Sequence, residues 1–104
     1  MDTGMKWGLL LSAVAMFTAI VIFTYGSPNG ADLFRNQGCI GCHSFKGKGG
    51  QACPDLTAVK GRRSDEWIRV QIKNPGKHNP NTRMPAFDNL SYREISAIIR
   101  YLKS

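Results

Sequence analysis

The chain has 104 residues, enough for one small domain, which excludes a large multidomain enzyme. Hydrophobic residues make up 42% and charged residues 20%, so the composition is that of a folded protein and not of a disordered one. Lys and Arg number 14 against 7 Asp and Glu, which gives a formal net charge of +7. Three cysteines exclude a framework of internal disulfides, because one is always left unpaired.

The N-terminal part carries a long apolar segment. Residues 7–25 contain no charged side chain, and as a helix they would extend about 28 Å, close to the hydrocarbon thickness of a bilayer. Trp7 and Tyr25 end the segment, and aromatic rings favour the membrane interface. A cleaved secretory signal ending near Gly26 is the alternative, but the segment is longer than the apolar part of such signals. We therefore predict that residues 1–26 form an N-terminal transmembrane anchor, embedded in the lipid bilayer.

Residues 27–104 form the second predicted unit, an all-α domain with much loop. Helices are expected over residues 31–37, from Ser64 to Asn74-Pro75, and over residues 92–103. The last helix is the best marked, since Ser91 and Glu94 form a capping box before apolar residues spaced i, i+3, i+4 and i+7. The glycine-rich residues 39–61 and the residues 77–89 are expected to be loop. The apolar residues of this domain make a thin core, which predicts that a cofactor or metal completes it.

A short motif concentrates the chemistry of the chain. Residues 39–43 read CIGCH, the C-x-x-C-H spacing that attaches c-type haem. Its two thiols can form thioethers with the vinyl groups on one porphyrin edge, and the histidine after them can bind the iron. A redox-active dithiol is one alternative, but it belongs beside a βαβ pattern that is absent here. A zinc site that adds Cys53 and His78 is another, but these two lack the close spacing of a second ligand pair. The motif predicts one covalent haem c, attached to Cys39 and Cys42, with His43 as a metal ligand.

A haem iron bound by one histidine needs a group on its other face. Met84 is the only methionine of the domain, and His78 is its only other histidine. His78 lies in a polar loop and is expected to be exposed, which favours Met84 as the second metal ligand. A His/Met pair raises the reduction potential of the iron and suits electron transfer.

Together these motifs resemble class I c-type cytochromes of the small, membrane-anchored, monohaem type. The resemblance covers residues 30–103 and is carried by CIGCH, CPDLT at 53–57, DEWI at 65–68, RMPAF at 83–87 and EISAIIRYL at 94–102. It implies three to five helices around one haem, with the first and last helices crossing.

The same resemblance assigns roles to single residues. It implies that His43 is the proximal ligand and Met84 the distal one, and that the carbonyl of Pro54 accepts a hydrogen bond from His43 Nδ1. Trp67 would pack near the haem edge and its propionates. The chain departs from the family at Cys53, where glycine is usual, and we expect a small buried thiol there.

Charge and resemblance together suggest partners. The basic surplus lies in residues 27–104 and favours encounter with acidic faces of redox proteins, whereas nucleic acid is not expected. The resemblance implies an electron-transfer protein and not an enzyme, on the periplasmic or extracytoplasmic side of the cell membrane. It would carry single electrons between respiratory or photosynthetic partners, such as a quinol-oxidising complex and a terminal oxidase or reductase. The alternatives are a haem-bearing subunit packed within a larger membrane respiratory complex and a haem enzyme or gas-binding protein.

Overall fold

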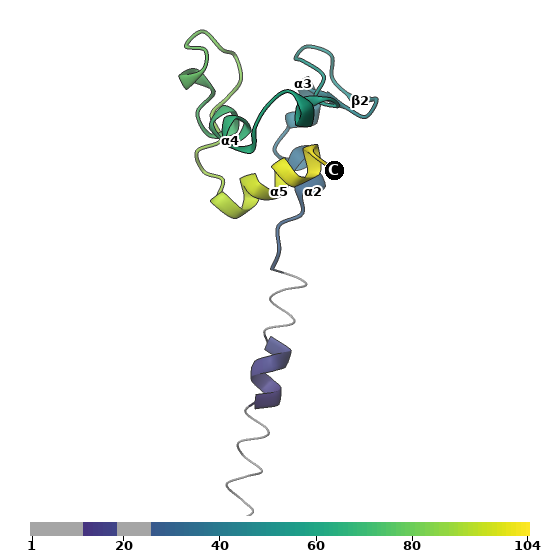
Figure 1. The fold of residues 1–104 in the computed structure, drawn as a ribbon, viewed down its shortest axis with the longest axis vertical. Coiled ribbons are helices and arrows are strands. Elements are labelled where there is room, and N and C mark those ends of the chain that lie inside the picture. Colours follow the sequence, from purple (N-terminus) through teal and green to yellow (C-terminus); the bar gives the residue numbers. More distant parts are fainter. Residues whose placement is uncertain (1–11, 19–25) are drawn as a thin grey trace, which may run out of the picture.

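The computed structural model describes residues 12–18 and 26–104 (Figure 1). Residues 12–18 are helical, and their large apolar side chains Val14, Met16 and Phe17 are exposed. Among the described residues, none of the helices combines the length and the apolar character that crossing a membrane requires. The predicted anchor, residues 1–26, lies mostly outside the described residues.

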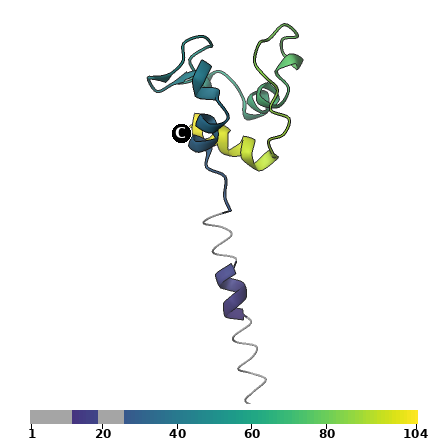
Figure 2. The same cartoon turned by 180° about the vertical axis from the view of Figure 1, so that it is seen from behind.

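Residues 26–104 form the expected helical domain. Its α-helices are α2 (Gly30–Asn36), α3 (Cys39–Cys42), α4 (Asp65–Lys73) and α5 (Tyr92–Leu102). Two 3-10 turns, η1 (Val59–Gly61) and η2 (Pro75–Lys77), and a hairpin of β1 (Ser44–Phe45) and β2 (Lys48–Gly49) complete it. The two opposite views in Figures 1 and 2 show α5 along the base of the domain, in contact with both α2 and α4.

The helix starts are set by polar side chains that satisfy free backbone N–H groups. The hydroxyl of Ser64 accepts a hydrogen bond from the backbone N–H of Trp67 at 3.1 Å, which fixes the start of α4. The predicted capping box of α5 is present: Glu94 N–H donates to Ser91 Oγ at 3.1 Å, and Ser91 N–H donates to Glu94 Oε1 at 2.9 Å. The first helix begins at Gly30, one residue before the predicted start, because Asn29 caps it.

The expectation that residues 39–61 are all loop was wrong. Cys39–Cys42 form the short helix α3, and residues 44–49 form a hairpin in which Phe45 pairs with Lys48. Lys46 and Gly47 between the strands both have positive φ, 50° and 81°, as a two-residue hairpin turn requires. The strands are too short for an alternating apolar pattern, so periodicity could not reveal them.

Helices α2 and α5 pack closely because glycine stands at their contact. A Cβ built on Gly30 would lie 2.0 Å from the backbone oxygen of Ala97, so no larger residue fits without movement. The aromatic rings of Phe34 and Tyr101 extend this contact, with centroids 5.7 Å apart. The first and last helices of the domain, which were predicted to cross, are therefore in close contact.

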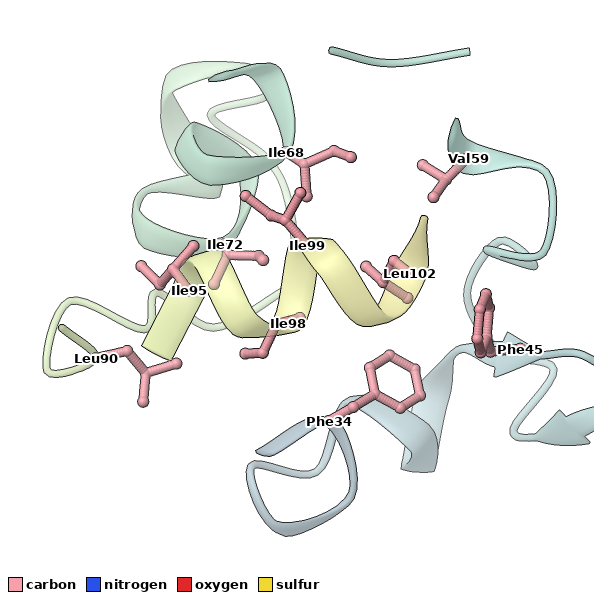
Figure 3. Close-up of a cluster of buried hydrophobic side chains, with 10 residues drawn as sticks. All are labelled: Phe34, Phe45, Val59, Ile68, Ile72, Leu90, Ile95, Ile98, Ile99 and Leu102. Atoms are coloured by element: carbon pink, nitrogen blue, oxygen red, sulfur yellow. The ribbon is translucent and has the colours of Figure 1, made fainter. Parts of the chain in front are cut away.

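The apolar core lies between α2, α4 and α5 (Figure 3). Leu90 and Ile95, on either side of the capping box, are both buried in it, as a hydrophobic staple would place them. The buried cluster is made of Phe34, Phe45, Val59, Ile68, Ile72, Leu90, Ile95, Ile98, Ile99 and Leu102.

Candidate functional site

A largely apolar cavity of about 480 Å³ opens beside this core. Six of the ten buried core residues also line it: Phe34, Val59, Ile68, Ile72, Ile98 and Leu102. Much of the core thus also forms part of the cavity wall, and the volume lies in the range of small-molecule and cofactor sites. A ligand in this cavity would complete the thin core.

Most of the residues singled out from the sequence meet at this cavity, although they lie far apart in the chain. Those that line it are Cys39, His43, Pro54, Trp67 and Met84. Cys42 does not line it and is exposed. Its backbone oxygen instead accepts a hydrogen bond from the N–H of Cys53 at 3.0 Å, which ties the motif to the following loop.

His43 ends α3 and is oriented by one hydrogen bond. Its Nδ1 lies 2.7 Å from the backbone oxygen of Pro54. A carbonyl oxygen can only accept, so Nδ1 carries a hydrogen, and in the neutral ring Nε2 then keeps its lone pair. This is the contact that the resemblance implied, and it leaves Nε2 free to bind a metal.

The two candidates for the second axial position lie in different places. Met84 is half-buried and lines the cavity, whereas His78 is exposed and does not. Met84 is held from two sides: its N–H donates to Thr82 Oγ1 at 3.2 Å, and its Sδ accepts from Gln71 Nε2 at 3.4 Å. The geometry favours Met84 as the group that faces a ligand in the cavity.

Gln71 was missed in the sequence analysis. It follows Trp67 by four residues on α4, so both side chains lie on one helix face and line the cavity. That spacing was visible in the sequence, but a glutamine four residues from a tryptophan has no special meaning until the sulfur of Met84 is placed next to it.

The pKa directions of the thiols and the arrangement of the described side chains do not favour the alternative sites considered above. Burial raises the pKa of Cys39, whereas the first cysteine of a redox-active dithiol needs a lowered pKa. Burial, followed by interaction with the Cys42 thiol, also raises the pKa of Cys53. Among the described residues, no group of three or more His, Cys, Asp or Glu side chains is arranged to hold a metal such as zinc.

The expectation of a buried Cys53 was wrong, because its side chain is only half-buried. It lines the cavity beside Ala52 and Pro54, both of which are exposed. A side chain on this part of the wall keeps access to solvent, which explains the difference.

Basic side chains gather at the exposed part of the cavity wall. Arg62, Arg63 and Arg83 all line the cavity and are exposed. Arg62 donates to the backbone oxygen of Asp55 at 3.2 Å, and the guanidinium of Arg63 lies 4.1 Å from the ring centroid of Trp67. These three residues, hereafter the arginine rim, suit a ligand that is apolar at its centre and anionic at its edge.

Comparison with known proteins agrees with this chemistry. The family model of cytochrome c matches residues 27–104. Cytochrome c of Tetrahymena pyriformis is 34% identical over 95 residues, which covers 72% of this chain and 84% of that protein.

Two further relatives are subunits of larger enzymes. A nitric oxide reductase subunit of Stutzerimonas stutzeri is 33% identical over 84 residues, 71% of this chain and 54% of that protein. Cytochrome c oxidase subunit 2 of Alkalihalophilus pseudofirmus is 31% identical over 83 residues, 72% of this chain and 24% of that protein. The chain therefore spans only about half and about a quarter of these two relatives.

The site fits the cofactor of this family. The apolar walls match a porphyrin ring, the arginine rim matches its two carboxylates, and the thiol of Cys39 and the imidazole of His43 are at the wall. The match over residues 27–104 and the fit of the cavity lead to one conclusion: the chain belongs to the cytochrome c family and carries a covalently bound haem c.

Proposed function

We propose that this protein is a membrane-tethered carrier of single electrons whose one haem iron is ligated by His43 and Met84. Cys39 and Cys42 are the attachment points, and the second thioether requires the exposed Cys42 side chain to turn toward the cavity. The observation that carries the proposal is that an oriented imidazole and a thioether line one apolar cavity. Haem iron with these two ligands supplies one-electron chemistry at a raised potential.

The protein's own residues would keep the two ligands fixed. Pro54 O holds the ring of His43, and Gln71 with Thr82 holds Met84. The surrounding isoleucine, leucine, valine and phenylalanine side chains exclude water and leave little room for rearrangement. A site that changes little between oxidation states suits an electron carrier better than an enzyme that must bind a substrate at the metal.

Replacing Met84 with Ala tests the ligation. Loss of the thioether should lower the reduction potential, abolish the sulfur-to-iron charge-transfer band and let carbon monoxide or cyanide bind rapidly. Leu56→Ala is the matched control, because Leu56 lines the same cavity and offers no ligand atom. A Met84→Ala protein with the spectrum and potential of the wild type would refute the proposed ligation. Rapid carbon monoxide binding by the wild type would favour the gas-binding alternative.

The arginine rim supports the proposal that partners approach with an acidic face. Three exposed cations at the cavity mouth add to a net charge of +7, and such a field speeds association with acidic surfaces. We propose respiratory partners, a quinol-oxidising complex as donor and a terminal oxidase or reductase as acceptor. Electron transfer with such partners should slow as salt rises, and an Arg83→Gln protein should show a weaker salt dependence. Electron-transfer rates that do not depend on salt concentration would contradict this mode of docking.

The membrane tether and the extracytoplasmic location are supported by the uncharged residues 7–25 and by the exposed apolar side chains of residues 12–18. Intact mass measured on protein from native membranes tests the tether. Full-length mass plus one haem is the expected result. Haem on a chain cut near Gly26 would instead indicate a soluble shuttle.

A second candidate function is that of a haem-bearing subunit within a larger complex. It is favoured by the two relatives whose names describe subunits of an oxidase and a reductase. Purification in mild detergent separates the two candidates. Stoichiometric co-purification with large membrane subunits would favour the complex, and isolation alone would favour the free carrier.

A further inference from the structure

We propose that His78, although it is not a ligand, positions the distal methionine by fixing the orientation of the Gln71 side-chain amide. The inference builds on the proposed ligation by Met84. Two hydrogen bonds link the three residues: His78 Nδ1 lies 2.8 Å from Gln71 Oε1, and Gln71 Nε2 lies 3.4 Å from Met84 Sδ. An exposed loop residue is thereby connected to the sulfur that lines the cavity.

The amide of Gln71 has two orientations of almost equal shape, with its oxygen and nitrogen exchanged. Only one of them presents an N–H donor to the sulfur; the other places the carbonyl oxygen against it. Since thioether sulfur is a weak acceptor, the contact with Met84 alone selects poorly between the two.

His78 selects one orientation in the tautomer that carries the hydrogen on Nδ1. When its Nδ1 carries a hydrogen, it donates to Gln71 Oε1, so the amide nitrogen must turn toward Met84. The opposite arrangement, with Nδ1 as acceptor, would put the amide oxygen against the sulfur and leave that contact without a donor. The donors and acceptors of these three side chains are matched in only one of the two arrangements.

The ring of His78 is itself held in place. It stacks on Trp67 with centroids 4.3 Å apart and planes inclined by 7°, and its backbone N–H donates to Pro75 O at 3.1 Å. Trp67 is in turn in contact with the guanidinium of Arg63. An exposed histidine with no role would be free to change rotamer, whereas the stacking on Trp67 restrains this ring and the backbone bond fixes the residue that carries it.

The hydrogen bond from Gln71 changes how much electron density the sulfur of Met84 can donate. A thioether has two lone pairs, and a donor on one draws electron density from the other. A sulfur that donates less electron density to ferric iron favours the ferrous state, so the Gln71 contact should raise the potential. Loss of His78 should reverse part of this rise in reduction potential, because the side-chain amide of Gln71 could then rotate and exchange its oxygen and nitrogen.

The test is a double-mutant cycle on the haem-loaded protein with His78→Phe and Gln71→Leu. Phe keeps a ring to stack on Trp67 but removes the Nδ1 donor. We expect His78→Phe alone to lower the reduction potential and to shift the sulfur-to-iron charge-transfer band. The same substitution should have no further effect in the Gln71→Leu protein, because the amide that transmits it is gone.

Asn81→Ala is the matched control, since Asn81 is a neutral, exposed residue of the same loop. It should leave the band and the potential unchanged. Equal shifts from His78→Phe in both backgrounds, or no shift in either, would overturn the role of His78 while Met84 ligation stands. Absence of the band in the unmodified protein would instead refute the ligation itself.

Discussion

The close contact between α2 and α5 gives the sharpest stability prediction, the effect of Gly30→Ala. A Cβ at position 30 would lie 2.0 Å from Ala97 O and 2.8 Å from Tyr101 Cβ, far inside ordinary van der Waals separation. The first of these atoms belongs to the backbone of α5 and cannot rotate away, so α2 and α5 must separate. Overpacking of this kind costs roughly 1–3 kcal/mol, and for a domain of this size about 2 kcal/mol lowers Tm by roughly 8–16 °C.

Thermal unfolding of the haem-loaded protein, followed by far-ultraviolet circular dichroism, measures this effect. Gly61→Ala is the matched control, because a Cβ there meets nothing within 4 Å. Its Tm should be unchanged or slightly raised, since alanine restricts the unfolded chain. If Gly30→Ala and Gly61→Ala unfolded at the same temperature, α2 and α5 would not pack as closely as described.

Two further predictions concern the thiols and a carboxylate. In the denatured, haem-loaded protein an alkylating reagent should label one thiol per chain, that of Cys53. Mass spectrometry should find Cys39 and Cys42 blocked by thioethers. Labelling of all three thiols would contradict covalent attachment. Hydrogen bonds from the backbone and side chain of Ser91 lower the pKa of Glu94. The ionised carboxylate therefore stabilises the fold above its unfolded pKa of about 4.3, and this stabilisation is lost as pH falls through the lower folded pKa. Glu94→Gln should therefore be less stable than the wild type near pH 7, and the difference should vanish in acid; a constant difference down to about pH 2 would be evidence against the capping carboxylate.

Two features of the fold could be predicted because they depend on residues close in sequence. The capping box of α5 needs only Ser91, Glu94 and the apolar spacing that follows, and all three survive in the structure. The CIGCH motif likewise carries its own chemistry in five consecutive residues. The short hairpin of β1 and β2 could not be predicted from the sequence, since two-residue strands leave no periodic signal.

At the candidate haem site, the sequence and the tertiary structure answer different questions. By itself the sequence limited the candidates for the second axial ligand to Met84 and His78 and predicted His43 as the first, because residue type limits which side chains can bind iron. Only the tertiary structure showed that Met84 lines the cavity and that His78 reaches it through Gln71. The physical reason is that the ability to bind a metal belongs to a single side chain. The side chains that face one another, in contrast, are set by the packing of α4, α5 and the intervening loop, which involves contacts between residues distant in the chain.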